Sequence, residues 1–218
     1  GVAIYTNHGY EFKARHPQPP ILPEANPVGV YRRDIDIPAD WQERDIYLHL
    51  AGAKSGVYVY VNGQEVGYSE DSKNPAEFLI SPYVKPGKNV LTLKIFRWST
   101  GSYLECQDFW RISGIERDVY LYSQPKAALK DFRAKSTLDD SYKNGVFALN
   151  VDLRNHRPAA TNLTLVYELL DAQGKVVASE EKTTYVPTNE TRTLSFDKNL
   201  ADVRTWTSEQ PNLYKLMM

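Results

Sequence analysis

Residues 57–68 read Val-Tyr-Val-Tyr-Val-Asn-Gly-Gln-Glu-Val-Gly-Tyr, and this stretch decides the fold class. Its first five residues are β-branched or aromatic without interruption, and such side chains favour extended backbone. Asn62-Gly63 follows at once, and this dipeptide is the strongest short-range signal of a tight β-hairpin. The strand pattern then resumes at residues 64–68. The sequence therefore predicts an antiparallel hairpin.

Further strands are predicted on both sides of this hairpin. Residues 46–50 alternate aliphatic with polar or aromatic side chains, the period-two pattern of a half-buried strand. Residues 90–96 follow a Pro-Gly-Lys turn at 86–88, and residues 119–122 alternate again. No long segment with the 3.6-residue period of a helix competes with them, so we predict an all-β sandwich.

The second half of the sequence repeats the strand pattern after Gln124-Pro125, which we interpret as a domain boundary because proline ends a strand and stiffens a link. A spacing of about ten to fifteen residues between strands is typical of an immunoglobulin-like sandwich. Five strands are predicted at 128–137, 146–153, 163–170, 176–184 and 191–196, and a sixth begins at 213–216. We therefore predict domains at 1–124 and 126–218, the second truncated at Met218, because an end inside a strand leaves backbone groups unpaired.

Composition excludes several classes of function. The chain has 26 Lys and Arg against 27 Asp and Glu, mixed along its length, so nucleic-acid binding has little support. No stretch approaches the roughly 20 apolar residues of a membrane helix, and the start does not resemble a signal peptide. We expect a soluble protein, cytoplasmic or periplasmic. The first residue is Gly1 rather than Met, from which we expect natural sequence upstream.

Metal and disulfide chemistry also find little support. Cys106 is the single cysteine, so no intramolecular disulfide can form. The histidines are scattered, and no pair has the i, i+4 spacing of a helical metal site. They are His8, His16, His49 and His156.

Residues 97–115 combine two tryptophans, Tyr103 and Phe109 with Glu105, Gln107 and Asp108. Such a mixture is typical of sugar recognition, because aromatic faces cover C–H surfaces while polar groups bind hydroxyls. The alternative is structural: Arg97 or Arg111 would pair with Glu105 or Asp108 beneath the aromatic side chains. Composition alone favours this structural interpretation.

The residues alone nominate no catalytic group. A retaining glycosidase needs two carboxylates about 5–5.5 Å apart. Glu105 and Asp108 could lie that close on a loop, but nothing marks one as the acid and the other as the nucleophile. The sequence contains no nucleophile elbow, Walker loop, dinucleotide fingerprint or H-E-x-x-H motif. Composition does not decide whether Asn7 caps a turn or contacts a ligand.

Several motifs together resemble the sugar-binding domain of family 2 β-galactosidases. The residues that carry this resemblance are Ile4-Tyr5-Thr6-Asn7, 26–32, 52–72, Ala76-Glu77-Phe78 and the long run 97–121. Residues 206–214 resemble the close of the family's first immunoglobulin-like domain. The resemblance therefore covers nearly the whole chain.

This resemblance implies a jelly-roll domain that lacks its first strands, followed by an immunoglobulin-like domain. In the family a TIM barrel with two catalytic glutamates comes next, and no part of it is present in this sequence. The chain is thus expected to be a non-catalytic N-terminal portion of a retaining β-galactosidase that hydrolyses terminal β-D-galactosides. By itself it should be inactive.

Two residues match the family's binding motifs. Asn7 matches an asparagine that reaches into the galactose subsite. Asp108 matches an aspartate that binds a galactose hydroxyl and is one ligand of a sodium ion beside the substrate. The galactoside and the missing barrel would complete this site. The portion itself is expected to hold no cofactor, whereas the parent would use sodium, and magnesium in the barrel.

The sequence departs from the family pattern at a few positions. Thr100 and Cys106 stand where aspartates are usual, Glu11 stands where proline is common, and His8 stands where a small apolar residue can occur. Related β-glucuronidases and β-mannosidases share the architecture, but the context of Asp108 in Gln-Asp-Phe-Trp-Arg favours a β-galactosidase.

Two other hypotheses stay open. The chain could be a free-standing carbohydrate-binding module with no hydrolase activity, because jelly rolls often serve as lectins. It could also be a structural pair of sandwiches that mediates assembly. A homo-oligomeric parent is kept as an expectation.

Overall fold

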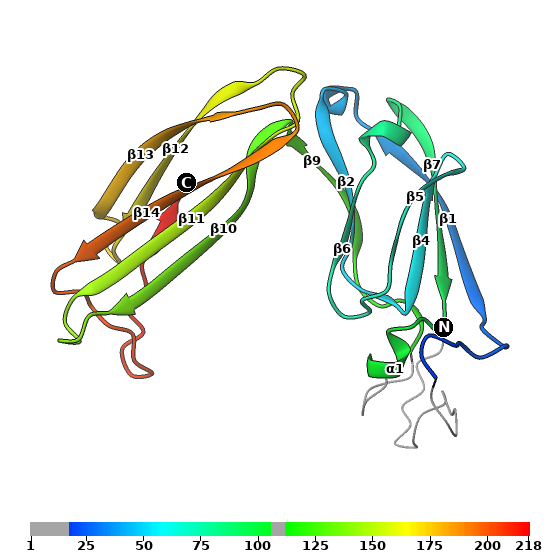
Figure 1. Cartoon of the computed structure of the whole chain (residues 1–218), viewed down its shortest axis with the longest axis horizontal. Coiled ribbons are helices and arrows are strands. Elements are labelled where there is room, and N and C mark those ends of the chain that lie inside the picture. The colour runs from blue at the N-terminus through cyan, green and yellow to red at the C-terminus, as the bar shows by residue number, and fades with distance from the viewer. Residues whose placement is uncertain (1–17, 106–111) are drawn as a thin grey trace. The chain divides into compact units, whose positions relative to one another are not determined.

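The computed structural model describes residues 18–105 and 112–218, and these are almost entirely β-structure, which confirms the all-β prediction (Figure 1). The chain divides into two compact units, Gly1–Pro125 and Lys126–Met218. Each unit has its own antiparallel sheets and its own hydrophobic core. The two units are described separately below.

The first unit contains a four-stranded sheet in the order β1-β7-β4-β5 and a three-stranded sheet in the order β6-β2-β9. The strands are β1 (Val28–Ile37), β2 (Arg44–Leu50), β4 (Gly56–Val61), β5 (Gln64–Ser69), β6 (Ala76–Leu79), β7 (Gly87–Phe96) and β9 (Val119–Pro125). The shorter elements are η1 (Ala39–Trp41), β3 (Ala53–Lys54), η2 (Ser81–Tyr83), α1 (Ser102–Glu105) and β8 (Gly114–Ile115). The two-residue strands β3 and β8 pair with each other.

The predicted hairpin is confirmed as β4 and β5. Its turn residues Asn62 and Gly63 have φ values of 52° and 82°, the left-handed backbone that an Asn-Gly turn requires. The Asn62 side chain also holds the start of β7, because its Oδ1 accepts from the Val90 N–H at 2.9 Å. Its Nδ2 donates to Oδ1 of the buried Asn89 at 2.8 Å. The hairpin is therefore joined to β7 by side chains as well as by the ladder.

The core of the first unit is aliphatic. Val57, Val59 and Val61 of β4 point inward and are buried, while Tyr58 and Tyr60 lie on the outer face of the same strand. Opposite them the aliphatic side chains of β2, predicted from its alternation, are buried too. Period-two alternation thus places one face of each sheet in the shared core.

Strand β1 differs from its neighbours. Its ten residues pair with β7 in an unbroken antiparallel register, from Val28 opposite Phe96 to Ile37 opposite Gly87. Eight of its ten side chains are nevertheless exposed, including the first seven. The hydrophobic pattern does not single out this strand, because Tyr31 is followed by two arginines and an aspartate.

The second unit has two three-stranded sheets, in the orders β10-β11-β14 and β13-β12-β15. The strands are β10 (Ala127–Leu138), β11 (Gly145–Asn155), β12 (Thr161–Leu170), β13 (Val176–Val186), β14 (Glu190–Leu200) and β15 (Lys215–Met217). The five predicted strands are confirmed, and the sixth begins two residues later than predicted.

An aromatic group lies at the centre of the second core. Tyr167 is fully buried between Phe147 and Phe196, whose ring centroids lie 5.8 and 5.1 Å from its own. Aromatic side chains are well suited to bridge two facing sheets because each buries a large area. Among the described residues, no helix is long or apolar enough to cross a membrane.

Candidate functional site

The loop that follows β7 carries the mixture of aromatic and acidic residues found in the sequence. It leaves the strand after Phe96 and enters the single turn of α1, at the end of the first unit where β7 finishes (Figure 1). Trp98 is 9% exposed and packs with Leu22 and Tyr103 in a small cluster of its own. Trp98 and Tyr103 therefore belong to the packed base of this loop.

Asn26 attaches the loop to the segment that precedes β1. Its side-chain Nδ2 donates to the Trp98 carbonyl at 3.0 Å, and its Oδ1 accepts from the Trp98 N–H at 2.9 Å. One asparagine thus satisfies both backbone groups of a tryptophan 72 residues away in the sequence. These two bonds fix the loop relative to the first strand.

Glu70, just after β5, supports the loop from one side. Its carboxylate accepts from the Thr100 hydroxyl and from the Gly101 N–H, the latter at 3.0 Å. Burial by itself would raise the pKa of Glu70, but the hydrogen bonds from Thr100, Gly101 and Tyr68 outweigh it and lower the pKa below its ordinary value. The carboxylate is therefore stabilised in its ionised form.

Glu105, the last residue of α1, supports the loop from the other side. Its Oε1 accepts from the Ser72 N–H at 3.1 Å and its Oε2 from the Ser72 hydroxyl at 2.5 Å. The structural interpretation had expected an arginine partner for this acid. The Glu105 carboxylate instead binds Ser72, while the Arg97 guanidinium lies over the Trp98 ring, 5.1 Å from the centroid.

Gly101 lies between these two supports. A Cβ built on it would be 3.3 Å from the Glu105 carboxyl carbon and 3.3 Å from the Glu70 carbonyl oxygen. Both spacings are tighter than ordinary van der Waals contact, so glycine lets the two acidic residues approach the loop closely. Because both carboxylates are occupied by protein donors, they act as supports of the loop. This geometry gives no support to Glu105 as half of a catalytic pair.

The departure at Thr100 now has a structural role. At this position, where the resemblance led us to expect an aspartate, the Thr100 hydroxyl donates to the Glu70 carboxylate. An aspartate in this position would instead put two like charges in contact.

The two predicted binding residues, Asn7 and Asp108, lie outside the described residues, as do Cys106, Glu11 and His8. Sequence reasoning missed Asn26, Glu70 and Ser72. Each meets its partner across 30 to 72 residues of sequence, so no local pattern reveals it.

The described residues contain no group of three or more His, Cys, Asp or Glu side chains that could hold a metal ion. His49 has a different environment. Its Nδ1 lies 2.9 Å from Oε1 of Glu77, and its ring stacks on Tyr120 with centroids 4.5 Å apart. Glu77 also accepts from the Tyr122 hydroxyl at 3.0 Å, and burial together with this bond raises the pKa of Tyr122 to about 12.

Comparison with known proteins agrees with this description. Residues 1–125 match the model of the glycosyl hydrolases family 2 sugar binding domain, and residues 127–218 match a second model of the same family. A β-galactosidase of Priestia megaterium is 39% identical over 98% of this chain. A β-galactosidase of Vibrio cholerae is 41% identical over 82% of it. The match spans only 21% and 17% of these two relatives, respectively.

Solved structures show the same fold. The β-glucuronidase of Bacteroides uniformis superimposes with a TM-score of 0.80 at 23% identity, over 87% of this chain and 24% of that one. The β-glucuronidase of Ruminococcus gnavus gives a TM-score of 0.66 at 22% identity, over 86% and 31%. From the two family models and these relatives, the chain belongs to glycosyl hydrolase family 2, with the sugar-binding domain of that family followed by its immunoglobulin-like domain.

Proposed function

We propose that this chain is the non-catalytic N-terminal portion of a retaining β-galactosidase and forms one wall of its galactose subsite. The observation that carries the proposal is the doubly supported loop. Glu70 and Glu105 hold the segment that leads within three residues to Asp108, the aspartate of the family's binding motif. A rigid support of this kind is what a binding residue needs. The relatives that match nearly the whole chain are β-galactosidases.

In this proposal Asp108 accepts a hydrogen bond from a galactose hydroxyl, and Asn7 provides a further polar contact. Asp108 would also give one oxygen ligand to the sodium ion. The other ligands, the two glutamates of the double displacement and a magnesium site would belong to the barrel of a longer polypeptide. One carboxylate holds an alkali ion weakly, so the 218 residues alone should retain no ion.

The first test is to express the source gene through its whole reading frame and to assay an aryl β-galactoside. The full-length product should hydrolyse it, and the 218-residue chain should not. Asp108→Ala in the full-length product should lower kcat/KM about 10–100-fold, the effect of losing a hydrogen bond to a charged group. Asp71→Ala, which removes a carboxylate from an exposed turn, is the matched control.

Two outcomes would reject the proposal. A stop codon directly after Met218, together with galactose binding by calorimetry, would favour the free-standing binding module. Hydrolysis by the repurified 218-residue chain would place catalytic groups within it.

A further inference from the structure

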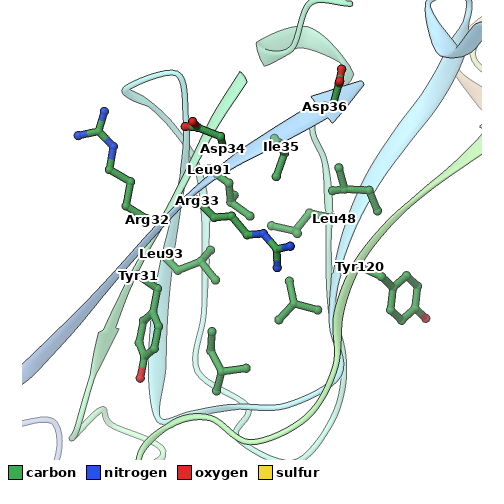
Figure 2. A pocket seen from close by; sticks show the side chains of 13 residues that line it. Tyr31, Arg32, Arg33, Asp34, Ile35, Asp36, Leu48, Leu91, Leu93 and Tyr120 are labelled. Carbon is green, nitrogen blue, oxygen red and sulfur yellow. The ribbon is translucent and has the colours of Figure 1, made fainter. Parts of the chain in front are cut away.

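The outer face of the four-stranded sheet carries a row of large side chains that lies apart from the loop described above. In register across β1, β7, β4 and β5, the members of this row are Val30, Lys94, Tyr58 and Tyr68. Phe96 lies two residues along β7 from Lys94, so its side chain joins the same face. Figure 2 shows which side of β1 is the outer one: Arg32 points away from the hollow that Arg33 enters.

The ring of Tyr68 lies across the sheet instead of standing out from it. A Cβ built on Gly56 would be only 2.7 Å from the Tyr68 hydroxyl, so the ring reaches over β4 where that strand has no side chain. The hydroxyl donates to the Glu70 carboxylate. Burial and the nearby charge of Glu70 raise the pKa of Tyr68, so the ring stays neutral. Tyr68 is nevertheless 42% exposed, and it therefore presents part of a fixed aromatic ring to solvent.

Two further rings extend this surface. The centroid of Tyr58 lies 4.4 Å from that of Tyr68 and 5.8 Å from that of Phe96. The Lys94 ammonium lies over the neighbouring Tyr60 ring, 4.9 Å from its centroid, and so beside the other three rings. Tyr58, Tyr68 and Phe96 are called the ring platform below.

The margins of the ring platform combine apolar and polar groups. Towards β1 the face continues with Val28 and Val30, which are 43% and 62% exposed. On the other margin the Tyr60 hydroxyl donates to Oε2 of Glu65 at 3.2 Å, and the Lys94 ammonium is a further donor. Aromatic rings bordered by a few donors and acceptors are typical of sugar sites. Four strands at a spacing of about 4.8 Å make the face roughly 14 Å wide, which suits a chain of sugars.

The position of the ring platform also favours a sugar over a protein partner. Phe96 is followed directly by the loop of the candidate site, and Tyr68 is bonded to Glu70, which supports that loop. A specific protein interface uses about 20–30 residues on each side, several times the number that forms this face. In galactose the axial hydroxyl leaves C–H groups together on one face of the sugar ring, and such a face packs well on an aromatic ring.

We propose that the ring platform is a second carbohydrate site, which binds an extended chain of β-linked galactose units by stacking. The choice of galactose rests on the proposed function, whereas stacking of a sugar chain rests on the platform alone. Binding here would hold a long galactoside close to the loop that supports the galactose subsite. The substrates of the intact enzyme would then include galactose oligosaccharides.

The test is calorimetry on the 218-residue chain with a linear tetrasaccharide of β-linked galactose. It should bind with a Kd of about 0.1–1 mM, and galactose should bind at least about tenfold more weakly because it covers less of the platform. The matching tetrasaccharide of β-linked glucose, which lacks the axial hydroxyl, should also bind about tenfold more weakly. In NMR spectra the galactose tetrasaccharide should shift the amides of β4, β5 and the end of β7, and leave those of β2 and β9 unchanged.

Three variants assign the binding to a ring. Tyr58→Ala should weaken binding of the galactose tetrasaccharide about tenfold, and Tyr58→Phe should restore it because the ring is kept. Tyr185→Ala, which removes a 61% exposed tyrosine of β13, is the matched control and should bind as the native chain does. Thermal unfolding checks that each variant is folded. If Tyr58→Ala does not fold, the amide shifts of the native chain still decide the site.

Several outcomes would overturn the proposal. Absence of binding at about 10 mM tetrasaccharide, or amide shifts confined to other strands, would reject the platform as a sugar site. Equal binding of the two tetrasaccharides would reject the choice of galactose. Concentration-dependent shifts of the same amides without sugar would show that a second copy of the chain covers this face. None of these readouts is hydrolysis, so this proposal can fail while the proposed function stands.

Discussion

Strands β4 and β1 flank the same strand, β7, and have opposite environments. Both pair with β7 through continuous antiparallel registers. Val59 of β4 and Tyr31 of β1 both lie opposite Leu93 and so share one face of the sheet, but Val59 is fully buried and Tyr31 is 38% exposed. The backbone ladder is thus sufficient to make a strand, but burial depends on what lies opposite. The second sheet covers the inner face of β4. The inner face of β1 instead borders an open groove lined by residues of β1 and β9.

The largest expected effect contrasts the buried Val59 with Val30 of β1, which lies opposite Lys94 on the outer face of the sheet. Val59→Ala removes two buried carbon atoms and leaves a cavity, so it should lower the free energy of unfolding of the first unit by about 2 kcal/mol. Val30→Ala should change it by less than about 0.5 kcal/mol. Urea-induced unfolding measures both values. Equal costs would mean that the outer face of β1 is covered in solution, and a dependence on protein concentration would then identify a second copy as the cover.

A smaller effect is expected at the attachment of β1. Asn26→Ala removes both bonds to the Trp98 backbone, which should cost about 1–2 kcal/mol. Because β1 has little burial to hold it, its amides should exchange faster while those of β4 change little. Asn162→Ala, at an exposed position of β12, is the control and should leave both strands unchanged. Uniform acceleration across the sheet would argue against a local role.

The smallest effect concerns pH at the end of β5. The folded-state pKa of Glu70 lies below its ordinary value of 4.5, so its contribution is complete above that value and is lost as the pH falls through the lowered pKa. The difference in Tm between the native chain and Glu70→Gln should therefore be largest at neutral pH and vanish in acid. A difference that is the same in acid would show that the hydrogen bonds do not depend on the charge.

The same contrast explains which strands the sequence could predict. The hairpin of β4 and β5 has both a continuous β-forming run and an Asn62-Gly63 turn, and each strand of the second unit alternates clearly. Strand β1 has no such pattern, because Arg32 and Arg33 interrupt the aliphatic alternation that marks a buried face. Strand β1 forms because it pairs with β7. Local periodicity does not reveal pairing between segments that are distant in the sequence.

The residues that support the candidate site could not be predicted for the same reason. The loop after β7 stands out by its composition, but its partners do not. Ser72 meets Glu105 across 33 residues and Glu70 meets Thr100 across 30, so only the folded chain brings them together. The family resemblance supplied Asn7 and Asp108, and these two residues remain predictions.

The charges of β1 have a further consequence for handling the protein. An edge strand that is open and apolar invites fibril growth, in which copies add to one another without limit. Arg32, Arg33, Asp34 and Asp36 interrupt the apolar run along this edge. They act as gatekeepers that favour colloidal solubility, so a concentrated solution should stay clear at moderate salt. Replacing all four by threonine should cause the solution to become turbid well before either sandwich loses stability.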